Sequence, residues 1–133
     1  MTDTAGNADL VELPSAEAFG PTLERVVATI EGAGLRVFAR IDHAAGAAEV
    51  GMAMPPTMLL VYGHPKGGTP IMLDTPAVAL DLPLRVLVRE DSEGRTLVSF
   101  HSVVPMLMKA GVPKSLARRL EPAQQLVVDA IRQ

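Results

Sequence analysis

Residues 84–100 read LRVLVREDSEGRTLVSF, and they predict how the sheet of this protein is built. Between positions 84 and 90 the side chains alternate, with Leu84, Val86 and Val88 on one side and Arg85, Leu87 and Arg89 on the other. A period of two is typical of a strand with one buried face. The tetrapeptide at 91–94 has the composition of a hairpin turn, with Gly94 where a positive φ is needed. Residues 95–100 are then the returning strand, so the sheet is at least partly antiparallel.

The other elements follow from periodicity and from the Gly and Pro residues between them. The pattern predicts strands over 10–13 (ended by Pro14), 35–42 and 57–62, and helices opening at Pro21 and running over 43–52 and 104–110. The strand at 57–62 is apolar throughout, which is typical of burial on both faces. From Pro113 on we expect one kinked helix, or two helices with Pro122 in the first turn of the second. The predicted architecture is a two-layer α+β sandwich with a mostly antiparallel sheet and helices mainly on one face.

Length and composition exclude several classes of protein. The chain has 133 residues, a net charge of −3, 48% hydrophobic residues and no cysteine, so disulfides, Cys-ligated zinc and iron–sulfur clusters are impossible. We expect residues 1–9 to be a flexible N-terminus and residues 10–133 to be a single domain. The longest apolar run is about five residues, far short of a membrane helix. With no basic excess and few aromatic residues, we predict a soluble cytoplasmic protein that binds neither nucleic acid nor membrane.

Three segments together resemble a known family. They are FARIDHAAGAAEVGM (38–52), PPTMLLVYGHPKGGTPIM (55–72) and LDLPLRVLVREDSEGRTLVSF (80–100). They resemble domain-of-unknown-function family 302, found in bacteria and archaea. The resemblance implies a curved antiparallel sheet with helices on one face, similar to TATA-binding-protein-like folds, and a homodimer. It implies no activity, and family members commonly carry Asn where this chain has His64.

The segment GHPKGGTP, residues 63–70, is the most suggestive stretch for ligand binding. We interpret it as a loop in which glycines allow backbone N–H groups to approach a ligand and Lys66 supplies a positive charge. The candidate ligand-binding residues are Gly63, His64, Lys66, Gly68 and Thr69, joined by Asp42 and His43. The alternative is a tight connection whose glycines serve only its geometry.

Asp42 and His43 form the best acid/base pair of the sequence. As an enzyme site the pair would use His43 as the base, with Ser99 or Thr57 as a nucleophile, although no nucleophile-elbow motif surrounds either one. The alternative is structural, because an Asp between a strand and a helix is a good N-cap.

Four arginines form a constellation by periodicity: Arg36, Arg40, Arg85 and Arg89. If their strands share one sheet, the four guanidinium groups are expected on one face, which would suit a carboxylate, a phosphate or an acidic partner. The alternative is a solvated face whose arginines pair with nearby acids. Phe38 and Leu87 on that face indicate partial burial, as at a dimer interface.

The histidines His43, His64 and His101 lack any local spacing typical of a metal site, so we predict no metal and no cofactor. The methionines are predicted to fill the core. The favoured hypothesis is a non-enzymatic homodimer that binds a small, possibly anionic ligand near the 63–70 segment and Asp42–His43. The alternatives are an enzyme using Asp42 and His43 on a small substrate, and a structural interaction module.

Overall fold

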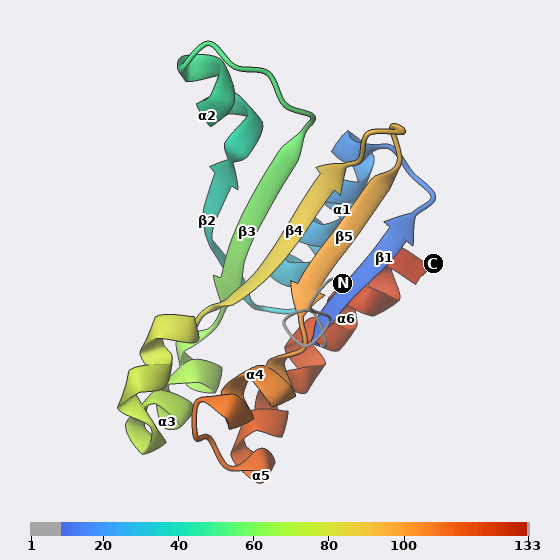
Figure 1. The fold of residues 1–133 in the computed structure, drawn as a ribbon. Helices are drawn as coiled ribbons and strands as arrows, with labels where there is room; N and C mark the ends of the chain where they lie inside the picture. The colour runs from blue at the N-terminus through green and yellow to red at the C-terminus, as the bar shows by residue number, and fades with distance from the viewer. Residues whose placement is uncertain (1–8, 133) are drawn as a thin grey trace, which may run out of the picture.

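A computed structural model describes residues 9–132, and within that range the strands form a five-stranded antiparallel sheet (Figure 1). Its order is β1-β5-β4-β3-β2, so β2 to β5 lie side by side in sequence order, whereas β1 pairs with β5 at the other edge. The strands are β1 (Leu10–Ser15), β2 (Arg36–Asp42), β3 (Thr57–Gly63), β4 (Leu84–Glu90) and β5 (Thr96–His101). The hairpin predicted from residues 84–100 is confirmed, with Gly94 at a φ of 80° in its turn.

The helices cover one face of the sheet and extend beyond both of its ends. They are α1 (Phe19–Gly32), α2 (His43–Glu49), α3 (Pro65–Asp74), α4 (Val103–Lys109), α5 (Lys114–Ala117) and α6 (Glu121–Arg132), with 3-10 turns η2 (Pro76–Asp81) and η3 (Arg118–Leu120). Figure 1 shows α1 and α6 behind the sheet, α3, α4 and α5 at its lower end, and α2 projecting from its upper end. The expected α+β architecture is therefore confirmed. Of the predicted flexible N-terminus, residues 1–8 lie outside the described range.

The core lies between the covered sheet face and the two long helices. Leu60, Val88 and Val98 are fully buried on the sheet, and Ile30 and Val127 meet them from α1 and α6. Each such side chain contributes about 1.5–3 kcal/mol when it leaves water. The opposite face of the sheet carries no helix in Figure 1, so the strands alternate between buried and half-exposed residues.

Two strand predictions need correction. β1 continues through Pro14 to Ser15 instead of ending at Pro14, because an edge strand tolerates a residue that has no N–H to donate. β3 is an interior strand, but only Leu60 and Tyr62 are buried in it. Thr57, Leu59 and Val61 face the open side of the sheet and are only half-buried, so the prediction of burial on both faces is wrong.

A β-bulge in β2 overturns the predicted facing of that strand. Val37 pairs with Tyr62 but Ala39 pairs with Val61, so Phe38 is an extra residue relative to β3. A one-residue insertion reverses the faces of all later side chains. Ala39 and Ile41 therefore lie on the opposite side of the sheet from Val37.

Residues 63–70 do not form a loop. Gly63 still belongs to β3, and α3 begins at Pro65. Proline is well suited to the first helical position because its missing N–H would have no partner there. The helix expected over 43–52 is shorter and ends at Glu49, whereas Pro122 does lie in the first turn of α6, as the two-helix alternative predicts.

A buried glutamine ties α6 to the sheet. The Oε1 of Gln124 accepts the backbone N–H of Val103 at 2.9 Å, and its Nε2 donates to the carbonyl oxygen of His101 at 2.7 Å. Both backbone groups lie where β5 ends and α4 begins. The side chain therefore satisfies two groups that burial would otherwise leave unpaired.

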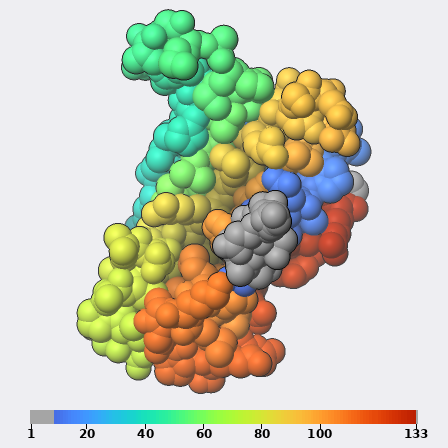
Figure 2. Space-filling model, viewed as in Figure 1, coloured from blue at the N-terminus to red at the C-terminus, as the bar shows by residue number. Residues whose placement is uncertain are grey.

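The segment after β2 projects from the rest of the molecule. Figure 2 shows residues near 45–55 standing clear of the sheet, and no side chain of α2 is buried. Met52 and Met54 are exposed there, as is Met108 on α4. The prediction that the methionines fill the core therefore fails for these three.

Candidate functional site

A cavity of about 650 Å³ lies where the end of β3 meets the start of α3. This is the end of the sheet that is lower in Figure 1. Its walls come from the end of α1, from β2, β3 and β4, from the first turns of α3 and from the start of α6. The residues that line it are mostly apolar or glycine; they include Leu35, Phe38, Tyr62, Gly63, Gly67, Gly68, Met72, Leu82, Pro83, Leu84, Leu120, Pro122, Ala123 and Leu126. The volume lies within the range of small-molecule sites.

The end of β3 and the start of α3 form one wall of the cavity. Gly63 has a φ of 152°, a conformation that side-chain-bearing residues rarely adopt. His64 then caps α3, because its Nδ1 accepts the backbone N–H of Lys66 at 3.1 Å. In the neutral imidazole this leaves the Nε2–H free to donate. The N–H groups of Gly67 and Gly68 bond to the carbonyl oxygen of His64, so they hold the helix turn together.

Gly67 allows α3 to pack closely against the turn before α6. A Cβ built on Gly67 would lie 3.1 Å from the Cδ2 of Leu120, closer than ordinary contact. A Cβ on Gly68 would instead meet the Cε of Met72 at 3.7 Å and the Cδ1 of Leu82 at 3.9 Å. Gly67 therefore allows a close approach that a side chain would crowd, whereas a methyl group at Gly68 would make only ordinary contacts at the cavity wall.

The charged groups at the cavity are all basic. Lys66 and Arg119 line it, and no Asp or Glu does so among the residues that the structure describes. Over 9–132, no carboxylate lies within 4.0 Å of either cation, whereas the neighbouring Arg118 pairs with Glu121 at 3.4 Å. Within the described part of the chain, the cavity thus combines apolar walls with two cations that have no acidic partner, although the chain as a whole is acidic.

Tyr62 reaches the cavity from the core. Its ring is almost fully buried, and its hydroxyl donates to the carbonyl oxygen of Ala123 at 3.1 Å. Burial raises the pKa of the Tyr62 phenol above its usual range, because the phenolate would lose its hydration. The phenol therefore stays protonated and anchors α6 to β3, and it is the only tyrosine of the chain.

Five of the seven predicted ligand-binding residues lie together in the structure, and the other two lie elsewhere. Gly63, His64, Lys66, Gly68 and Thr69 all line the cavity. Asp42 and His43 do not, because Asp42 pairs with Met58 at the far end of β3. Gly63 lies five residue steps along the strand from Met58, which is roughly 17 Å. The expectation that both segments share one site is therefore wrong.

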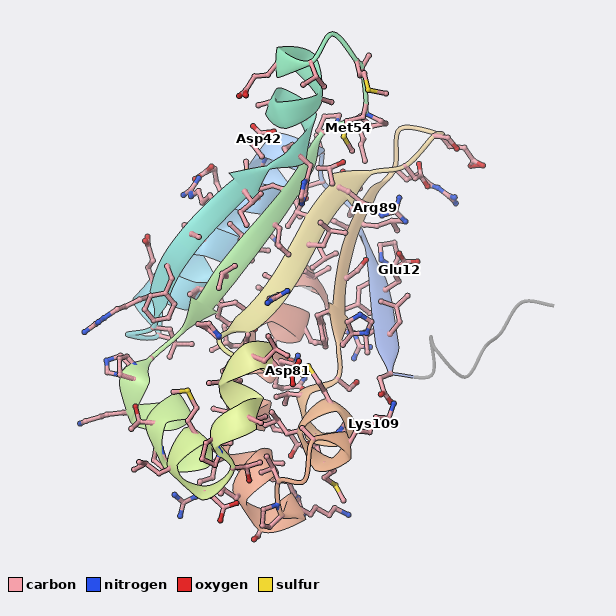
Figure 3. The ribbon with its side chains drawn as sticks, turned by 60° about the vertical axis from the view of Figure 1, so that its left-hand side comes forward. Glu12, Asp42, Met54, Asp81, Arg89 and Lys109 are labelled. Atoms are coloured by element: carbon pink, nitrogen blue, oxygen red, sulfur yellow. The ribbon has the colours of Figure 1, made fainter. Side chains whose placement is uncertain are left out.

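Asp42 has a structural partner. Its Oδ1 accepts the backbone N–H of Ala45 at 2.9 Å, so the N-cap interpretation is confirmed. Figure 3 shows Asp42 at the upper end of the sheet, below α2. His43 follows it as an exposed residue at the start of α2.

The two residues suggested as nucleophiles have other partners. Ser99 hydrogen bonds to Glu12 at 3.2 Å, and Thr57 hydrogen bonds to the carbonyl oxygen of Pro55 at 2.9 Å.

The four arginines do not share one face. Three of them lie on the open face of the sheet, because their partners are all odd-numbered positions of β3, which share that face. Arg36 pairs with Gly63, Arg85 with Val61 and Arg89 with Thr57. Arg40 pairs with buried Leu60 and faces α1, where its Nη1 lies 3.6 Å from the Oε2 of Glu24. The bulge at Phe38 is the physical reason, because it reverses the strand between the two β2 arginines.

Arg89 is also already paired. It donates to the Oε2 of Glu12 at 3.0 Å, and Figure 3 shows the two side chains together on the open face.

Over residues 9–132, no three His, Asp or Glu side chains come close enough to hold a metal ion. No helix within the same range is long and apolar enough to cross a membrane.

The sequence interpretation missed the larger part of the cavity. Arg119, Pro122 and Leu126 come from a region that was assigned only a helical pattern, and Phe38 was assigned to an interface. No local sequence pattern places Arg119 at the cavity, because its position there depends on the packing of η3 against Gly67. The one available signal was the pair of glycines after Lys66.

The fold and the cavity define a class: an α+β protein with an apolar, cation-rimmed cavity at one end of an antiparallel sheet. Within that class the chain belongs to the family described as "Domain of unknown function DUF302", whose model matches residues 11–133. The fold also matches the crystal structure of an uncharacterized conserved DUF302 protein from Bacillus stearothermophilus. The two are 17% identical with a TM-score of 0.83, over 93% of this chain and 98% of that one.

Curated relatives at higher identity are longer proteins. A fluoride-specific ion channel, FluC 1 of Brucella suis biovar 1 (strain 1330), is 43% identical over 89 residues, which cover 67% of this chain and 35% of the channel protein. FluC 2 of Brucella melitensis biotype 1 is also 43% identical over 89 residues, 33% of its length. The matched segment is thus about a third of the channel proteins.

Proposed function

We propose that this protein binds a small amphipathic anion, with the apolar part of the ligand inside the cavity and its acidic group at Lys66 and Arg119. The observation that carries the proposal is the composition of the cavity wall: apolar side chains, two cations without a carboxylate partner, and no acidic residue among those described. A cation at the mouth of an apolar site favours an anionic group over a neutral one, because the surrounding walls weaken screening by water. No step of bond making is part of the proposal.

The test uses the emission of Tyr62, since the chain has one tyrosine and no tryptophan. Decanoate should change the emission saturably, whereas decanamide, its neutral analogue, should bind more weakly. The double variant Lys66→Gln/Arg119→Gln should lose about tenfold in affinity for decanoate, the worth of one charge-assisted hydrogen bond at an exposed site. Its affinity for decanamide should not change.

The matched control is Lys114→Gln/Arg118→Gln. These two cations lie within five residues of Arg119 in the sequence but do not line the cavity. The control should bind decanoate like the unmodified protein. Equal loss in both double variants would mean that only the overall charge matters, and it would overturn the assignment of Lys66 and Arg119.

We propose further that two copies associate through residues 43–56. Support comes from exposed apolar side chains in this projecting segment: Val50 is 72% exposed and Met52 is 68% exposed. The segment carries only one acidic residue, Glu49, and no Lys or Arg. Identical surfaces that meet across a two-fold axis repel each other when charged, so a nearly uncharged segment suits a second copy.

Light scattering during size-exclusion chromatography tests this association. Met52→Glu should convert a dimer to a monomer, because it places a charge at the contact. Leu73→Glu, at a residue equally exposed on α3, should leave the dimer intact. A monomeric unmodified protein, or dimers in both variants, would refute association through this segment.

The channel relatives favour a second candidate function, in which this chain acts together with a fluoride channel. Support comes from the 43% identical segment within the FluC proteins. A fluoride ion is small and strongly hydrated, so the apolar cavity is not its binding site. We expect the chain, added to vesicles that contain a FluC channel lacking the matching segment, to change the rate of fluoride efflux. An unchanged rate would remove this candidate.

A further inference from the structure

We infer that the apolar part of the ligand is a flat aromatic ring and that Phe38 is the residue that selects it, so that the ligand class is an aromatic acid. This inference rests on the function proposed above and adds the shape of the ligand. Three residues carry it: Phe38 on β2, Gly63 at the end of β3 and Pro83 just before β4. All three line the cavity.

The bulge in β2 places the Phe38 ring. The register moves from Val37–Tyr62 to Ala39–Val61, so Phe38 has no residue opposite it on β3. Bulges beside binding sites commonly redirect one side chain. The ring is 46% exposed, although the chain has only three Phe and one Tyr. A ligand that covers this ring removes apolar surface from water.

Gly63 leaves bare backbone between two rings. A Cβ built on Gly63 would lie 3.7 Å from the Cβ of Pro83 and 4.0 Å from the Cε2 of Phe38. Both distances are ordinary van der Waals contacts, so a methyl group at this position would touch Pro83 and Phe38, and the bare backbone of Gly63 leaves that space open. Glycine in a strand commonly marks a place where a ligand approaches the backbone closely. A flat ring fits such a place.

Entropy favours a ring over a chain at this position. An alkyl chain must fix each of its rotatable bonds when it binds, whereas a fused aromatic ring has none to fix. An aromatic ring against Phe38 also gains the favourable offset or edge-to-face geometry of aromatic pairs. With Lys66 and Arg119 lining the same cavity, the acidic group of the ligand has its partners.

Calorimetric titration with 2-naphthoate and decanoate tests the inference, since the two acids have the same charge and a similar number of carbon atoms. The unmodified protein should bind 2-naphthoate more tightly. Phe38→Leu should weaken 2-naphthoate binding about tenfold, the upper end of what one aromatic pair contributes, and change decanoate binding by less than about twofold. Phe38→Tyr keeps a ring and should restore the preference. Ile41→Leu, on the same strand outside the cavity, is the control.

The outcomes separate the two proposals. If decanoate binds the unmodified protein as tightly as 2-naphthoate, or if Phe38→Leu weakens both equally, the aromatic preference is overturned while ligand binding stands. If neither acid binds, both proposals are overturned. Because Phe38 is half-exposed, Phe38→Leu is expected to fold, and unchanged melting of the variant checks this.

Discussion

Adjacent glycines in α3 have different roles at the scale of single residues. A Cβ at Gly67 would press on the Cδ2 of Leu120 at 3.1 Å, so Leu120 would have to shift slightly, whereas one at Gly68 would make ordinary contacts with the ends of Met72 and Leu82. Glycine in a helix costs up to about 1 kcal/mol relative to alanine. No packing contact requires glycine at position 68, and the space beside this residue belongs to the cavity.

Gly68→Ala should therefore leave the free energy of unfolding unchanged or raise it by up to about 1 kcal/mol, because it gains helix propensity without a clash. Gly67→Ala should gain less, since Leu120 must move. Urea unfolding of both variants measures the difference. A loss of more than about 1 kcal/mol in Gly68→Ala would show that the residue is required by packing and not by the cavity.

Asp42 is the residue whose role the sequence predicts best. Asp42→Ala removes the N-cap of α2, which costs about 1 kcal/mol. Because no side chain of α2 is buried, this helix can unfold by itself, and the effect should be local. Hydrogen exchange of the α2 amides should accelerate about fivefold, while His43→Ala should leave it unchanged. No change in Asp42→Ala would contradict the capping role.

At the scale of elements, the attachment of α6 depends on Gln124. Gln124→Ala leaves the N–H of Val103 and the carbonyl of His101 without partners, and we expect a loss of about 2–3 kcal/mol in the free energy of unfolding. The neighbouring Gln125 bonds only to Asp129 on the exposed side of α6, so Gln125→Ala should cost less than about 0.5 kcal/mol. Denaturant unfolding of the two variants provides the comparison, and equal losses would contradict the role of Gln124.

The order of the elements was predictable because each signal is local. The alternation at 84–90, the Asp91–Gly94 turn and the Asp42 cap each depend on residues a few positions apart. The bulge was not predictable, because the 35–42 segment alternates regularly in sequence and only pairing with β3 reveals the insertion. A short helix was predictable only around Ile71–Leu73, because Gly67 and Gly68 disfavour a helix in the first turns of α3, where Gly67 packs against Leu120.

For the whole molecule, antiparallel pairing decides which predicted site residues meet. The 63–70 segment was correctly singled out, but Asp42 and His43 lie at the other end of the strand that precedes it. Arg119 enters the cavity from far along the chain, through the packing of η3 on α3. Such a contact depends on tertiary structure and leaves no pattern in the sequence.

The methionine methyl groups provide the most direct test that the cavity is the ligand site. Met72 lines the cavity, whereas Met52, Met54 and Met108 are exposed elsewhere on the surface. In an NMR titration of the protein labelled with ¹³C at its methionine methyls, 2-naphthoate should shift the Met72 signal saturably through its ring current. The other three signals should stay in place. If the Met72 signal does not move, or if the exposed methionines shift at lower concentration, the cavity is not where the ligand binds.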